Sequence, residues 1–84
     1  MANIRIYTTP YCPYCVRAKQ LLRQKQAAFD DIDVSNDPEQ RQALVALTGQ
    51  RTVPQIFIND QSIGGCDDLF ALERAGRLDA LINQ

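Results

Sequence analysis

The order of strand and helix patterns in the first half of the chain constrains the fold more than any other feature of the sequence. Residues 3–8 (NIRIYT) alternate in polarity, which is typical of a strand. From Pro13 the apolar residues follow helical spacing, and residues 28–34 (AFDDIDV) indicate a second strand. A helix between two strands predicts a parallel pair joined by a right-handed crossover.

The middle of the chain predicts a second helix and a hairpin. Asp37 can cap the free N–H groups of a helix, and Pro38 suits its first position. Gly49 is typical of the end of such a helix. Residues 52–60 (TVPQIFIND) predict a buried strand that turns back into a short returning strand.

The last part of the chain predicts one more helix. It starts at Asp67 or Asp68 and ends near Gly76, and residues 78–82 (LDALI) add the final apolar contacts. The order β-α-β-α-β-β-α predicts an α/β fold with a four-stranded mixed sheet and three helices. With 84 residues there is room for one core, so residues 1–84 are expected to form a single domain.

Composition and charge exclude several classes of protein. The formal net charge is -1, which argues against a nucleic-acid-binding protein. The chain has no apolar run near the roughly 18 residues of a membrane span, and its first residues lack the pattern of a secretory signal. We therefore expect a cytoplasmic protein that binds neither nucleic acid nor membranes.

Two cysteines stand three residues apart in the segment YCPYC, at the predicted start of the first helix. Residues at this spacing share a helix face, and their Cα separation of roughly 5–6 Å suits a disulfide between Cys12 and Cys15. Such a disulfide would close a very short loop and would stabilise the fold little. The expected reducing compartment also argues against a permanent bond. We therefore interpret the pair as a reversible redox couple.

A metal site is the main alternative for these cysteines. Zinc sites need four ligands, typically two such cysteine pairs or one pair with two histidines. This chain has one pair, a distant Cys66 and no histidine, so we expect no metal site within one chain. A metal ion or an iron–sulfur cluster held between two chains stays open, because two copies would supply enough sulfur.

The two sulfurs of the pair are expected to differ. Cys12 would face the unpaired N–H groups at the start of the helix, which favour a thiolate. Arg17 and Lys19, on the polar face, would add to this effect if they point back toward Cys12. Cys15 lies on the apolar face and should stay a shielded thiol. We predict that Cys12 is the nucleophile and Cys15 the resolving thiol.

Three motifs in this order, CPYC, TVP and GGCDD, resemble those of the glutaredoxins, and in particular the short bacterial dithiol class. The resemblance covers essentially the whole chain. It implies a thioredoxin-like fold and a cis peptide bond before Pro54. It also implies a glutathione-dependent thiol–disulfide oxidoreductase that reduces protein disulfides and protein–glutathione mixed disulfides.

The resemblance further implies where glutathione would bind as co-substrate. The main chain of Val53 would pair with it like an added strand. The N–H groups of Cys66 and Asp67 would hold the γ-glutamyl carboxylate, and the Asp67 side chain would meet the γ-glutamyl ammonium group. The implied binding residues are Tyr14, Arg41, Thr52, Val53, Pro54, Gly65, Cys66 and Asp67.

One position departs from the family pattern. Many glutaredoxins have a lysine or arginine where this chain has Thr9. This departure leaves open which cation holds the glycine carboxylate of glutathione; Arg41 is our first candidate and Arg51 the second. Cys66 is expected to be a small buried filler, although oxidation or glutathionylation of this thiol stays open.

The resemblance implies glutathione and disulfide-bonded or glutathionylated proteins as partners, with ribonucleotide reductase as one candidate and a monomer as the working state. Two alternative functions stay open. One is an iron–sulfur cluster carrier, which a colourless anaerobic preparation would argue against. The other is a redoxin served by thioredoxin reductase, and the GGCDD segment argues against it because it suits a γ-glutamyl clamp.

Overall fold

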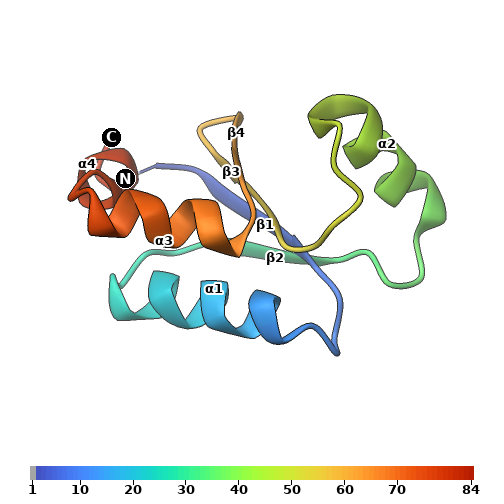
Figure 1. Ribbon diagram of the computed structural model, residues 1–84, viewed down its shortest axis with the longest axis horizontal. Coiled ribbons are helices and arrows are strands. Elements are labelled where there is room, and N and C mark those ends of the chain that lie inside the picture. Colours follow the sequence, from blue (N-terminus) through green and yellow to red (C-terminus); the bar gives the residue numbers. More distant parts are fainter. Residues whose placement is uncertain (1) are drawn as a thin grey trace.

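The computed structural model of this protein describes residues 2–84 and places a four-stranded sheet among four helices (Figure 1). The strands are β1 (Ile4–Thr8), β2 (Asp30–Asp33), β3 (Gln55–Ile58) and β4 (Gln61–Gly64). The helices are α1 (Pro13–Gln24), α2 (Pro38–Thr48), α3 (Cys66–Arg74) and α4 (Leu78–Ile82). The predicted order is confirmed, but the predicted number of three helices is wrong because residues 78–82 form a fourth.

The fourth helix is separated from α3 by a backbone turn. Gly76 has a φ of 71°, a left-handed conformation that ends a helix without steric cost for glycine. Leu78 and Ile82 lie one helical turn apart and are both buried, so a single turn brings both side chains into the core. The Ala2 N–H also donates to the Ile82 carbonyl across 2.8 Å, which joins the two ends of the described chain.

The strand order in the sheet is β2-β1-β3-β4. β1 pairs in parallel with β2, and β3 pairs antiparallel with β4, as the sequence predicts. The structure adds that β3 is also antiparallel to β1. The β3–β4 hairpin turns at Asn59 and Asp60, whose φ angles are 51° and 64°, which suits a two-residue turn.

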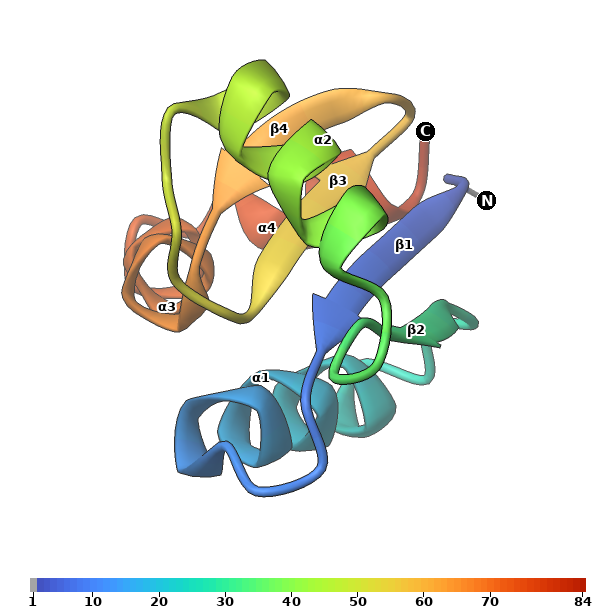
Figure 2. The same cartoon turned by 90° about the vertical axis from the view of Figure 1, so that its right-hand side faces the viewer.

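The sheet buries both of its faces. Ile6 and Ile56 belong to the larger apolar cluster, which also contains side chains of α1 and α3. Tyr7 and Phe57 point to the opposite face and pack with Leu44 of α2. Figure 2 accordingly shows α2 apart from α1 and α3, with strands between them. Within residues 2–84, no helix has the length and apolar character needed to cross a membrane.

Candidate active site

The sulfur of Cys12 lies at the N-terminus of α1. Cys12 is the residue that caps this helix, and Pro13 occupies the first helical position, as predicted. The backbone N–H of Cys15 donates to the Cys12 sulfur across 3.2 Å. The Cys12 thiol in turn lies 3.5 Å from the carbonyl oxygen of Val53. A backbone N–H aimed at a sulfur stabilises negative charge on it, so this position suits a nucleophilic thiolate.

Cys15 has a different environment. Its side chain is fully buried, whereas Cys12 is partly exposed. Burial, followed by the hydrogen bond with Cys12, raises the pKa of the Cys15 thiol to about 12. The backbone N–H of Thr9 and the charge of Lys19 act in the opposite direction but do not cancel this rise. Cys15 is therefore a protonated thiol at neutral pH, and it lies next to the partly exposed Cys12.

A groove of about 300 Å³ opens beside this pair. It contains all of the predicted binding residues except Arg41, and the Val53–Pro54 peptide bond within it is cis. The residues that line this active-site groove are Tyr14, Gln50, Thr52, Val53, Pro54, Gly65, Cys66, Asp67 and Asp68. Gln50 was not among the predicted residues, because its only signal in the sequence is its place shortly before the TVP motif.

Two helix N-termini meet at the active-site groove. In Figure 1, α1 and α3 lie side by side and run in the same direction, and both begin near the middle of the molecule. The first N–H groups of a helix have no carbonyl partners within it and carry partial positive charge. The groove can therefore stabilise negative charge both at Cys12 and at the start of α3.

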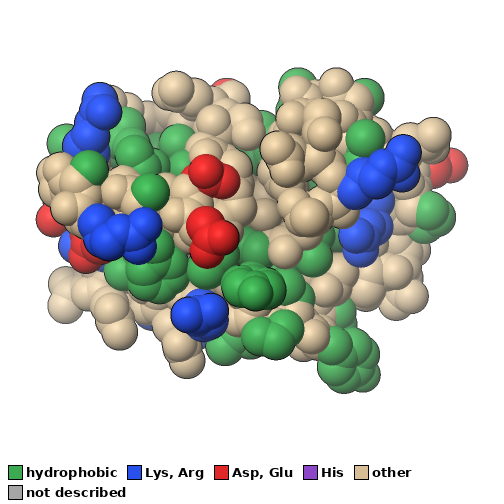
Figure 3. Space-filling model, viewed as in Figure 1, with side chains coloured by type: hydrophobic (Ala, Val, Ile, Leu, Met, Phe, Trp, Pro, Cys, Tyr) green, Lys and Arg blue, Asp and Glu red, His purple; other side chains and the backbone are tan. Residues whose placement is uncertain are grey.

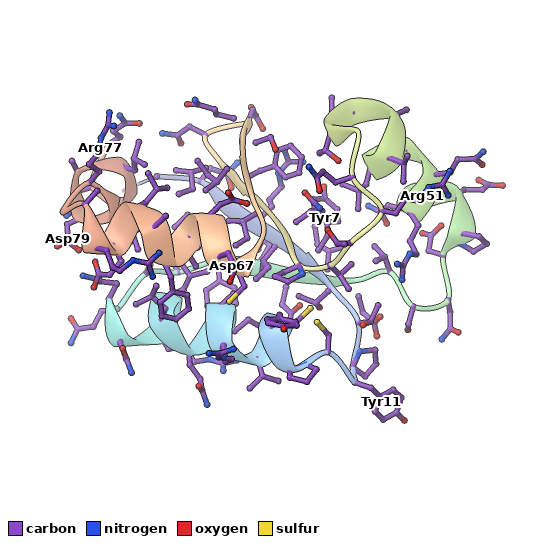
Figure 4. The ribbon with its side chains drawn as sticks, viewed as in Figure 1. Tyr7, Tyr11, Arg51, Asp67, Arg77 and Asp79 are labelled. Atoms are coloured by element: carbon purple, nitrogen blue, oxygen red, sulfur yellow. The ribbon has the colours of Figure 1, made fainter. Side chains whose placement is uncertain are left out.

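The start of α3 separates the roles of two neighbouring aspartates. The Asp68 carboxylate accepts a hydrogen bond from the Gly65 N–H across 2.9 Å and so caps the helix. The Asp67 carboxylate is exposed and has no hydrogen-bond partner among residues 2–84. Figure 4 places Asp67 at the start of α3. The Asp67 carboxylate is thus available to a ligand, whereas the Asp68 carboxylate already accepts the hydrogen bond from Gly65.

Arg41 lies outside the active-site groove, on α2. It lines a neighbouring hollow of about 500 Å³ together with Arg51, and its guanidinium donates to the Arg51 carbonyl across 3.3 Å. Gln50 and Thr52, which flank Arg51 in the chain, line the active-site groove, so the hollow and the groove share the segment 50–52. Figure 3 shows basic side chains gathered on the α2 side of this face. The two candidate cations therefore lie next to each other, in a hollow that shares a chain segment with the groove.

The two basic residues of α1 that were expected near Cys12 have other partners. The guanidinium of Arg17 lies over the Tyr14 ring, 5.8 Å from its centre. The Lys19 ammonium group forms an ion pair with Asp31 across 2.8 Å. The positively polarised group that contacts the Cys12 sulfur is therefore the Cys15 N–H at the start of the helix, rather than either of these side chains.

The third cysteine is the first residue of α3. Cys66 is buried, and burial raises the pKa of its thiol, as expected for a small apolar filler. All three cysteines are free thiols. Within residues 2–84, no three Cys, Asp or Glu side chains gather closely enough to hold a metal ion.

Comparison with known proteins places the chain in one family. The Glutaredoxin family model matches residues 4–63. A protein named Glutaredoxin from Pseudomonas aeruginosa is 54% identical over 83 residues, which cover 99% of each chain. Glutaredoxin 3 from Escherichia coli K12 is 49% identical over 82 residues, which cover 98% of this chain and 99% of that protein.

Solved structures share the fold. A crystal structure of a buckwheat glutaredoxin–glutathione complex has a TM-score of 0.92 at 34% identity and matches 98% of this chain and 77% of its own. The solution structure of glutaredoxin from Brucella melitensis has a TM-score of 0.88 at 52% identity, and the match covers 98% and 89% of the two chains. The chain therefore belongs to the glutaredoxin family of thiol–disulfide oxidoreductases and has a thioredoxin-like fold.

Proposed function

We propose that this protein uses glutathione to reduce protein–glutathione mixed disulfides and protein disulfides, with Cys12 and Cys15 as the reacting thiols. It would act in the cytoplasm as a monomer, with residues 1–84 forming one glutaredoxin domain. One observation carries the proposal. The Cys12 sulfur lies at a helix N-terminus and within 3.5 Å of the Val53 main chain, at the edge of a groove sized for a small peptide.

The chemistry of the active-site groove, together with the two arginines of the neighbouring hollow, fits glutathione. The main chain of Val53 offers hydrogen bonds to an extended peptide. The γ-glutamyl carboxylate suits the free N–H groups at the start of α3, and the exposed Asp67 carboxylate suits the ammonium group beside it. The glycine carboxylate suits Arg41 or Arg51 in that hollow. The buckwheat relative that was solved with glutathione supports this choice of ligand.

In the first branch, the Cys12 thiolate attacks the glutathione sulfur of a mixed disulfide. A Cys12–glutathione disulfide forms, and the protein thiolate leaves and takes up a proton. A second glutathione, as thiolate, then attacks the bound glutathione sulfur. Oxidised glutathione leaves and Cys12 is regenerated. This branch needs one cysteine of the pair.

The second branch needs both cysteines. Cys12 attacks a protein disulfide and forms a mixed disulfide with one of its sulfurs. Cys15 then attacks Cys12, the reduced protein leaves, and a Cys12–Cys15 disulfide remains. Two glutathione molecules reduce this disulfide and become oxidised glutathione. The helical spacing that places Cys15 beside Cys12 supports this step.

Apolar side chains beside Cys12 support protein substrates. Tyr11 is 95% exposed, and Tyr14 and Val16 are about half exposed around the same helix start. Figure 4 shows Tyr11 at the outer tip of the loop before α1. Exposed aromatic side chains are common in protein-binding surfaces. Ribonucleotide reductase is one candidate substrate, proposed from the family resemblance alone.

Two serine variants test the proposed function. The assay follows release of glutathione from a glutathionylated peptide, with reduced glutathione as the electron donor. We expect Cys12→Ser to abolish the activity, because no nucleophile remains at the helix start. We expect Cys15→Ser to keep most of it, because glutathione itself resolves the intermediate. Equal loss in both variants would contradict the single-cysteine branch.

A further inference from the structure

A line of polar contacts runs beside the buried Cys15 and connects β1, β2 and α1. The Thr8 hydroxyl donates to one carboxylate oxygen of Asp31 across 2.6 Å. The Lys19 ammonium group donates to the other oxygen across 2.8 Å. Thr8 is buried, and only 19% of the Lys19 side chain is exposed. Lys19 is therefore held against the protein, although helical spacing assigns it to the polar face.

Helix geometry brings Lys19 to Cys15. Residues four apart on a helix are neighbours, and helical side chains lean toward the N-terminus. The Lys19 stem therefore extends over the turn that carries Cys15. The backbone N–H of Thr9, the residue after Thr8, favours negative charge on the Cys15 sulfur, as does the charge of Lys19. Two positively polarised groups thus face the same buried thiol.

The carboxylate in this line stays charged at neutral pH. Burial favours the neutral form of Asp31, but the hydrogen bonds from Lys19 and Thr8 outweigh it and lower the pKa of the carboxyl. A permanent carboxylate keeps the ammonium group of Lys19 in one place, and a strong hydrogen bond to buried Thr8 keeps the carboxylate in place.

Cys15 needs such help in the resolving step. A thiol must lose its proton before it attacks a disulfide, and burial opposes the charge that results. Cys12 caps the helix and accepts the Cys15 N–H, whereas the side chain of Cys15, the third residue of the helix, is fully buried. Any group that stabilises negative charge on Cys15 accelerates the second branch of the proposed function.

We propose that Lys19, held by Asp31 and Thr8, stabilises the Cys15 thiolate during its attack on the mixed disulfide at Cys12. In this step Cys15 gives its proton to water, and its sulfur bonds to the Cys12 sulfur. The bond from Cys12 to the substrate breaks, and the electron pair leaves on the substrate sulfur, which takes a proton from water. The step needs no other oxidant or reductant. The inference rests on the proposed function, and specifically on Cys15 as the resolving thiol.

Lys19 is expected to act on the second of two reaction steps, and the rates of the two steps can be measured separately. Reduced protein is mixed with a disulfide-bonded peptide without glutathione, and samples are quenched in acid at timed intervals. Mass spectrometry then follows the mixed disulfide and its conversion to the Cys12–Cys15 disulfide. The first rate depends on Cys12 and the second on Cys15, so the first is an internal control.

Three variants make the comparison. We expect Lys19→Met to slow the second step about tenfold, since a charge about one helical turn away is only partly screened. The first step should change less than twofold, within the usual scatter of surface charge effects. Lys19→Arg keeps the charge and should restore most of the rate. Lys25→Met removes the chain's only other lysine, which pairs with Glu73 and Asp79 instead, and should change neither rate.

Several outcomes would overturn the proposal. Lys19→Met could slow both steps equally, or it could leave the rate of the second step unchanged. Lys19→Arg could also be as slow in the second step as Lys19→Met. Circular dichroism and thermal unfolding check that each variant folds, and Lys19→Gln replaces Lys19→Met if that variant does not. If the wild-type protein resolves the peptide disulfide but does not transfer glutathionyl groups, the proposed glutathione function fails while the role of Lys19 stands.

Discussion

The backbone N–H of Cys15 donates a hydrogen bond to the sulfur of Cys12 across 3.2 Å. One cysteine of the pair thus stabilises charge on the other, even before any bond forms between them. The geometry follows from helix capping, because Cys12 caps α1 and Cys15 is its third residue. The sulfur of Cys12, the proposed nucleophile, is therefore held by a regular element rather than by a free loop.

The two aspartates at the start of α3 should respond differently to substitution. Asp67→Ala removes a free carboxylate beside the proposed γ-glutamyl ammonium site, so we expect the KM for glutathione to rise about tenfold, as for loss of a charge-assisted hydrogen bond. Asp68→Ala removes the bond to the Gly65 N–H and should lower the free energy of unfolding by about 1 kcal/mol. Steady-state kinetics and urea unfolding of both variants check this, and an unchanged KM in Asp67→Ala would remove the clamp assignment.

The assignment of Arg41 to the glycine carboxylate predicts a change in ligand discrimination. The wild-type protein should use glutathione better than γ-glutamylcysteine, which lacks the glycine. Arg41→Gln should reduce this preference about two- to fivefold, because an exposed ion pair contributes at most about 1 kcal/mol. Arg74→Gln removes the same charge at the far end of α3 and is the matched control. An undiminished preference in Arg41→Gln would move the assignment to Arg51.

The raised pKa of Cys15 predicts that the reduced protein loses stability in alkali. Below about pH 9 the thiol is protonated in both states and contributes nothing. Between about pH 9 and the folded pKa of about 12, the unfolded chain ionises while the folded protein does not. The free energy of unfolding should therefore fall by at most about 1.4 kcal/mol per pH unit from this group. Urea unfolding at several alkaline pH values should show a steeper loss for the reduced wild type than for Cys15→Ser, and parallel curves would contradict the prediction.

Two glycines with positive φ should differ in their tolerance of alanine. Gly64 has a φ of 112°, and a Cβ there would overlap the carboxylate of Asp68. Gly76 has a φ of 71°, and a Cβ there would extend into open space, with no contact within 4 Å. We expect Gly76→Ala to cost about 1 kcal/mol from backbone strain alone, and Gly64→Ala to cost about 2–3 kcal/mol. Urea unfolding measures both costs, and equal values would mean that the contact with Asp68 adjusts freely.

Local patterns predicted most of the backbone. The buried residues of α1, among them Ala18 and Leu22, follow the helical spacing of the apolar residues after Pro13. Asp37 caps α2 by accepting from the Gln40 N–H, and Gly49 ends it in a left-handed conformation, both as expected. These features were predictable because capping and periodicity act between residues at most four apart.

Other features were not predictable in this way. The helix at residues 78–82 is too short to show a period of its own, and packing of Leu78 and Ile82 against the core forms it. Lys19 carries the charge typical of a solvated face, but Asp31, twelve residues later in the sequence, draws it inward. Periodicity records which face a residue occupies and carries no information about a partner on another element.

The short motifs were enough to indicate the element order, the position of the cysteine pair at a helix start and the family, since each motif reports on its own neighbours in the chain. Long-range packing was needed to bring Cys12 to Val53, 41 residues away, and to set α3 beside α1 with both N-termini at one groove. Packing also decided that Asp68 caps α3 and that Asp67 stays free. The sequence cannot show this difference, because the two side chains are adjacent and chemically identical. Such contacts depend on how the sheet buries its two faces, and that burial is a property of the whole chain.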